Sequence, residues 1–150
     1  MIRRVVLPWV FLSFVFTGCA PLPKLIILQD PLSPEEHLVL GASYEAEGAW
    51  DLALSEYREA LQKSGRKEEV YFLIGNVYHQ RGDYSEAERS YGRAIQINSR
   101  FAPAYNNLAW NFLKEGKKQE AIRAAREALE IAPDNPDYQD TFQRISGETY

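Results

Sequence analysis

Side chains suited to chemistry are scarce in this sequence of 150 residues, which holds one cysteine, Cys19, and two histidines, His37 and His79. A single cysteine forms no disulfide within the chain, and this set is too small for a Cys/His zinc site. Neither histidine has a nucleophile at a spacing that helix geometry would bring beside it. We therefore expect no catalytic residue, no metal ligand and no cofactor.

Two adjacent acidic pairs, Glu35-Glu36 and Glu68-Glu69, are poor candidates for acid–base catalysis. Neighbouring residues of a helix point apart, and the macrodipole favours acidic side chains at a helix start. The glycines form no phosphate-binding motif, and a net charge of −4 with a pI near 5.3 argues against nucleic-acid binding. The sequence therefore predicts a protein that is not an enzyme and binds neither a small-molecule substrate nor nucleic acid.

Cys19 ends a segment with the layout of a secretory signal. Two arginines at 3–4 form a basic start, residues 5–16 (VVLPWVFLSFVF) form an apolar run, and small residues at 17–18 precede the cysteine. The apolar run is shorter than the roughly 20 residues that a membrane-spanning helix needs. We therefore interpret residues 1–18 as a signal peptide.

The tetrapeptide Phe16-Thr17-Gly18-Cys19 resembles the lipobox of bacterial lipoproteins. The resemblance implies that the first 18 residues are removed and that Cys19 becomes a lipidated first residue, anchored in the cell envelope and facing the periplasm. Ala20 stands where aspartate would imply retention at the inner membrane, so the outer membrane is favoured. The alternatives are a plain signal peptide, or a short membrane anchor with an incidental cysteine.

Residues 19–33 are predicted to form a tether. Prolines at 21 and 23 favour an extended backbone, and residues 25–28 (LIIL) form an apolar run that either packs over the first repeat or contacts the bilayer. Loss of the first 18 residues leaves 15 of the 17 basic residues and all 21 acidic ones, a net charge of −6. This charge opposes electrostatic docking onto anionic lipid, so membrane attachment depends on the acyl chains.

The body of the chain consists of three copies of a 34-residue unit, at residues 34–67, 68–101 and 102–135, which align without insertion. When the sequence is shifted by 34 residues, the three copies align at an aliphatic, a small and an aromatic position, and then at a glycine and two alanines. The aligned sets are Leu40, Ile74 and Leu108; Gly41, Gly75 and Ala109; Tyr44, Tyr78 and Phe112; Gly48, Gly82 and Gly116; Ala53, Ala87 and Ala121; and Ala60, Ala94 and Ala128. The sequence therefore predicts a repeat architecture.

Each unit is predicted to hold two helices. Apolar and small residues recur at spacings of three and four in both halves of the unit, as on one face of a helix. The recurring glycine, Gly82 in the second copy, is predicted to end the first helix in a left-handed conformation. Ser33 with Glu36 predicts a capping box where the first helix begins, and Asp83 with Glu86 predicts an aspartate variant of it.

The motifs Leu-Gly-x-x-Tyr at 40–44, Ile-Gly-x-x-Tyr at 74–78, and Ala-x-x-x-Tyr at 53–57 and 87–91 resemble the tetratricopeptide repeat (TPR), whose period is 34. The resemblance covers residues 34–135 and implies an all-α fold, a right-handed α-solenoid of three helix-turn-helix repeats. The third copy departs from the pattern, because it has alanine at 125 where an aromatic residue is expected.

Residues 136–150 are predicted to hold a C-terminal capping helix and a tail. Tyr138, Phe142 and Ile145 form one apolar stripe, and polar residues occupy the other side. Such a helix covers the open end of a solenoid. The alternative is a helix offered to a partner.

In TPR proteins, a set of positions on the first helix of each unit lines a concave groove. Here the large apolar and amide side chains of this set suit an extended peptide or a partner helix. The predicted groove residues are Leu38, Phe72, Asn76, His79, Gln80, Asn106, Trp110, Leu113 and Lys114. The alternative occupants are the apolar run at 25–28 and a second copy of the chain.

The sequence also indicates how a possible carboxylate clamp and the two histidines should be placed. Some TPR domains clamp a terminal carboxylate with lysine and asparagine; Asn76 matches one asparagine, whereas Phe72 stands where the lysine would be. His37 occupies a core position and is expected to be a packed histidine, and His79 is expected to make a polar contact in the groove.

These features predict a lipid-anchored, non-enzymatic TPR adaptor that binds a protein or peptide partner in the bacterial envelope. Two alternatives share the same fold. One is a pilotin-like assembly factor for a secretin or type IV pilus component, and the other is an accessory protein that recruits cell-wall enzymes. The sequence does not choose between them.

Overall fold

The computed structural model describes residues 30–147 and divides the chain into two units, residues 1–30 and 31–150. The predicted signal peptide at 1–18, the proposed lipidation site Cys19 and the tether as far as residue 29 lie outside the described residues. None of the helices in the described part is long and apolar enough to cross a membrane.

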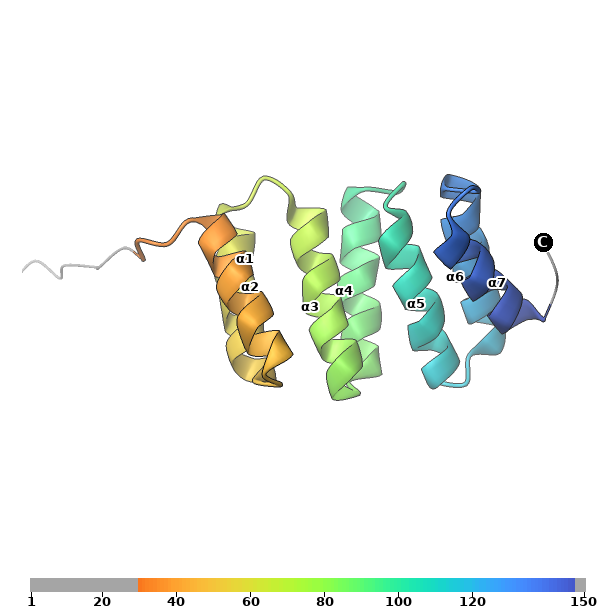
Figure 1. Cartoon of the computed structure of the whole chain (residues 1–150), viewed down its shortest axis with the longest axis horizontal. Helices are drawn as coiled ribbons and strands as arrows, with labels where there is room; N and C mark the ends of the chain where they lie inside the picture. The colour runs from red at the N-terminus through yellow and green to blue at the C-terminus, as the bar shows by residue number, and fades with distance from the viewer. Residues whose placement is uncertain (1–29, 148–150) are drawn as a thin grey trace, which may run out of the picture. The chain divides into compact units, whose positions relative to one another are not determined.

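The described residues form seven helices and no strand. The helices are α1 (Pro34–Ala46), α2 (Trp50–Lys63), α3 (Lys67–Arg81), α4 (Tyr84–Ile97), α5 (Ala102–Lys114), α6 (Lys118–Ile131) and α7 (Pro136–Ser146). Figure 1 shows α1, α3, α5 and α7 on the near side of this unit and α2, α4 and α6 behind them. Helices adjacent in sequence pack against one another along the array. The prediction of an all-α solenoid of helix hairpins with a C-terminal capping helix is confirmed.

Each of the first two hairpins is closed by a tyrosine that packs on a glycine. A Cβ atom at Gly41 would lie 2.5 Å from Tyr57 Cε1, and one at Gly75 would lie 2.6 Å from Tyr91 Cε1. Both tyrosines are almost completely buried. The third hairpin has buried alanines at both corresponding positions, 109 and 125. Alanine at 125, in place of the tyrosine, therefore accompanies alanine at 109, in place of the glycine. The two changes go together because the methyl group at 109 leaves less room for an aromatic ring.

The helix ends confirm one part of the sequence reading and correct another. Gly48, Gly82 and Gly116 have φ angles of 73°, 88° and 75°, the left-handed conformation that the repeat predicts. The capping box at α1 is present, since the Ser33 hydroxyl accepts from the backbone of Glu36 and the Glu36 carboxylate accepts from the backbone of Ser33.

The predicted aspartate box at α4 is wrong. Asp83 makes no side-chain hydrogen bond to the helix start, and its carboxylate pairs with Arg81 instead. A guanidinium two residues away attracts the carboxylate more strongly than a neutral backbone N–H does.

His37 is a packed histidine, as predicted, with 2% of its surface exposed. Its Nδ1 lies 2.8 Å from Glu56 Oε2, and its Nε2 lies 3.4 Å from Lys63 Nζ. Both partners belong to α2, so the buried imidazole and its two less buried partners join the two helices of the first hairpin.

Helix α7 packs on the end of the third hairpin, as predicted. Phe142 and Ile145 are buried among residues of α5 and α6, with Tyr138 half-buried beside them. The Trp110 indole of α5 donates to Thr141 Oγ1 over 3.3 Å. The capping helix therefore also fixes one side chain of the predicted groove.

Candidate functional site

A hollow of about 300 Å³ lies between α3 and α5. Its lining residues come from three helices: Asn76, His79 and Gln80 from α3, Tyr91 from α4, and Asn107 and Trp110 from α5. Four of these six belong to the predicted groove set. The structure therefore brings part of that set together around one cavity.

The Asn76 amide has a fixed orientation. Its Oδ1 accepts from the Tyr91 hydroxyl at 2.9 Å and from Asn107 Nδ2 at 2.8 Å. Because the Tyr91 hydroxyl is buried, it needs an acceptor, and Asn76 Oδ1 supplies one. The Asn76 Nδ2 group is thus left as a donor at the hollow.

The hydrogen bonds around His79 also select one tautomer of its imidazole. Its Nδ1 lies 3.0 Å from Oδ1 of Asn111, a residue with no exposed surface. Asn111 Nδ2 faces two acceptors, the Tyr84 carbonyl at 2.9 Å and Glu115 Oε2 at 3.5 Å. This orients the amide with its oxygen toward His79, so Nδ1 must carry the proton. The Tyr84 ring packs beside the imidazole, with centroids 5.5 Å apart.

A carboxylate is bonded to one of the lining residues. The Glu45 carboxylate accepts from Gln80 Nε2 and, at 2.8 Å, from the Tyr57 hydroxyl. Burial raises the pKa of Tyr91 well above its usual range, and the negative charge of Glu45 adds to the rise. No lysine or arginine lines the hollow. The lining is therefore rich in hydrogen-bonding groups and holds no permanently cationic side chain.

The remaining predicted groove residues lie outside the lining of this hollow. Leu38 packs on the core of the first hairpin, and the Phe72 ring packs against Tyr91 and, edge-on, against Phe101. Asn106 donates to Asn107 Oδ1 at 3.3 Å. Leu113 and Lys114 are exposed near the end of α5.

Two lining residues were not predicted. Tyr91 lies on the second helix of its hairpin, and its repeat position reads as core. Asn107 follows a predicted groove residue directly. A signal for Asn107 exists in the sequence, since asparagines at 106, 107 and 111 recur on a single helix.

The Trp110 ring closes one side of the hollow. The guanidinium of Arg144 in α7 lies 5.2 Å from the ring centroid, and the indole N–H is bonded to Thr141. The ring is therefore held between the hollow and the capping helix.

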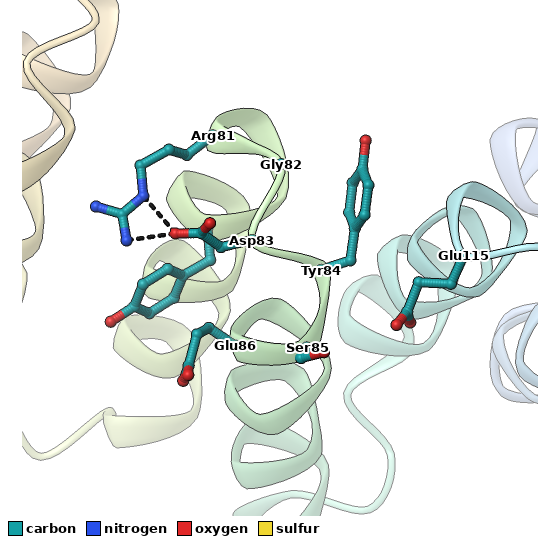
Figure 2. Close-up of a pocket in the computed structure, with 8 residues that line it drawn as sticks. Arg81, Gly82, Asp83, Tyr84, Ser85, Glu86 and Glu115 are labelled. Atoms are coloured by element: carbon teal, nitrogen blue, oxygen red, sulfur yellow. Dashed lines mark hydrogen bonds and ion pairs between the residues drawn. The ribbon is translucent and has the colours of Figure 1, made fainter.

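A larger hollow, of about 580 Å³, lies at the turn between α3 and α4. Figure 2 shows Arg81 facing Asp83 there, with Glu86 and Glu115 nearby. Its charged groups are paired: Glu86 with Arg89, and Glu115 with Lys117. This surface offers few free groups to a ligand, so the hollow between α3 and α5 is the better candidate.

Within residues 30–147, no group of three His, Cys, Asp or Glu side chains is placed to hold a metal ion. A third hollow, of about 470 Å³, lies on α1 beside Leu32, Val39 and Leu40 and is mainly apolar. It offers little hydrogen bonding and lies at the start of the helix array.

Comparison with protein families identifies the repeats. Residues 75–110 match a family model described as TPR repeat, and residues 102–135 match one described as tetratricopeptide repeat. None of the curated proteins with which the chain was compared matches it. Tetratricopeptide repeats are therefore present in the second half of the chain.

Solved TPR domains share the fold. The first TPR of Spaghetti (RPAP3) bound to the HSP90 peptide SRMEEVD is 21% identical, covers 77% of this chain and 94% of that one, and has a TM-score of 0.67. The Arabidopsis OM64 TPR domain is 20% identical over 77% and 95%, with a TM-score of 0.70. The second TPR domain of human RPAP3, in complex with the HSP70 peptide SGPTIEEVD, is 19% identical over 77% and 100%, with a TM-score of 0.66. At these identities, the structural similarity shows a shared fold and nothing more.

Proposed function

We propose that this protein is a non-enzymatic adaptor that holds an extended segment of a partner protein in the hollow between α3 and α5. The observation that carries the proposal is the lining of that hollow. It combines the Asn76 amide, the His79 imidazole and the Trp110 ring, which offer hydrogen bonds to a peptide backbone and an apolar surface to a side chain.

The solved relatives support a peptide-binding role. Two of them, which share this fold, are in complex with peptides, SRMEEVD and SGPTIEEVD. Because their sequences are so different from this one, these relatives indicate the architecture of the chain and not its ligand. The support therefore comes from this architecture together with the polar hollow.

Site-specific photocrosslinking in living cells tests the proposal. A photoreactive phenylalanine analogue placed at Gln80, which is exposed and lines the hollow, is expected to crosslink to a discrete partner. The matched control places the analogue at Arg123, an exposed residue of α6 that does not line the hollow. Equal crosslinking from both positions, or none from Gln80, would contradict the proposal.

We also propose that a lipid on Cys19 anchors the adaptor in the bacterial envelope, facing the periplasm and preferentially at the outer membrane. Support comes from the lipobox-like tetrapeptide at 16–19 and from the following alanine. The anchor would leave the repeat unit free to hold a partner near the membrane surface. No chemistry on a small-molecule substrate is needed for this role.

A further inference from the structure

We infer that the groove selects an internal, uncharged stretch of its partner, with a ligand N–H donating to His79 Nε2, and rejects a terminal carboxylate. Asn111 acts as the positioning residue for this specificity. The inference rests on the proposed function, because it concerns which peptide the same hollow accepts.

Asn111 is a polar residue at a buried position of the repeat. The aligned residues in the first and second copies are Ser43 and Val77, and Val77 is fully buried. Asparagine with no exposed surface is costly in such a position unless its polar atoms are bonded. Here the amide bonds both the Tyr84 carbonyl and His79. The polar residue in the core thus connects the groove to the backbone of the preceding hairpin.

The hydrogen bond between His79 Nδ1 and Asn111 Oδ1 selects one tautomer of the imidazole. With the proton on Nδ1, the neutral imidazole leaves Nε2 as an acceptor. Among the described residues Nε2 has no hydrogen-bond partner. Asn76 Nδ2, three residues earlier on the same face of α3, is a donor. One donor and one acceptor match the C=O and N–H groups of an extended backbone.

The groups around the hollow also disfavour a terminal carboxylate on the ligand. A carboxylate only accepts hydrogen bonds, so it cannot donate one to His79 Nε2. Its oxygen would instead face the lone pair of that nitrogen, which repels it. None of the six lining residues is a lysine or arginine, and the Glu45 carboxylate is bonded to Gln80 at the edge of the hollow. Arg144, beside the Trp110 ring, is already paired with Asp140. A terminal carboxylate would therefore lose water without gaining a cation among the lining residues.

The test compares two displayed libraries of random peptides on the full chain, purified in detergent and assayed at pH 8. One library presents the peptides between flanking carrier sequences, and the other presents them with a free C-terminus. We expect enrichment from the first. Synthetic versions of the selected peptides should bind equally with an amidated or a free C-terminus, and the acidic peptide SRMEEVD should not bind.

Two variants connect the binding to the residues. His79→Asn keeps a donor toward Asn111 and removes the Nε2 acceptor, so affinity should fall about tenfold, the value of one good hydrogen bond. Asn111→Val reproduces the residue of the second copy and should also weaken binding. Nitrogen-15 NMR of labelled histidine should show the Nδ1–H tautomer at His79 in the wild type and its loss in Asn111→Val; His37→Tyr assigns the two signals.

Several outcomes would overturn the inference alone. They are an Nε2–H tautomer in the wild type, unchanged binding by His79→Asn, or enrichment of acidic peptides with a free C-terminus that amidation abolishes. If neither library is enriched, the proposed function fails and the inference fails with it.

Discussion

The ring of Tyr91 packs directly on the backbone of Gly75, where a Cβ atom would lie 2.6 Å from Cε1. The same tyrosine donates its hydroxyl to Asn76, the residue after the glycine. One contact thus closes the second hairpin and orients a side chain of the candidate groove.

Gly75→Ala is therefore expected to destabilise the protein by about 1–3 kcal/mol, because the buried ring must move to accept the methyl group. Thermal unfolding followed by circular dichroism measures the effect. The double variant Gly75→Ala/Tyr91→Ala reproduces the alanine pair of the third hairpin, Ala109 and Ala125. The double variant should lose less stability than the two single variants lose in sum. Strict additivity of the two losses of stability would contradict the packing of Tyr91 on Gly75.

Trp110→Ala is expected to weaken both partner capture and stability, the latter by about 2 kcal/mol, because the ring lines the hollow and also packs beside α7. Photocrosslinking from Gln80 and chemical denaturation measure the two effects. Leu113→Ala is the control on the same helix, since Leu113 is 36% exposed and outside the lining, and should change stability by less than about 0.5 kcal/mol. Undiminished capture by Trp110→Ala would count against the groove.

His37→Ala should cost about 2–4 kcal/mol of stability, since it opens a cavity and removes the buried partner of Glu56 and Lys63. Urea denaturation measures the change. Gln62→Ala, at an exposed position of the same hairpin, is expected to be near neutral. Similar losses in the two variants would show that the contacts of His37 with Glu56 and Lys63 do not hold α1 to α2.

Cys19→Ala should abolish incorporation of labelled palmitate and release the protein from the membrane fraction, because several acyl chains bind a bilayer far more firmly than any contact of an acidic body. Metabolic labelling and fractionation measure both. Ser13→Ala, within the apolar run before the proposed cleavage site, is the matched control and should be labelled normally. Equal labelling of wild type and Cys19→Ala would refute the lipid-anchor proposal.

The asparagines illustrate the limit of reading the groove from the sequence. Repeat positions place Asn76 and Asn106 on the same side of their helices, and both lie in or beside the hollow. Asn111 lies five residues after Asn106, at a position that is apolar in the second copy. Its bonds reach Tyr84 and His79, 27 and 32 residues away, and depend on how one hairpin stacks on the next.

The sequence by itself determined the repeat, the helix pairs and the glycines that end the first helices, because these depend on short periodic spacings and on backbone conformation. The tertiary structure alone decided that Asp83 pairs with Arg81 rather than capping α4, that Tyr91 and Asn107 line the hollow, and that Asn111 sets the tautomer of His79. These features depend on side-chain packing and on hydrogen bonds between hairpins, and a helical period specifies which face a residue occupies but not which atom it meets across the interface.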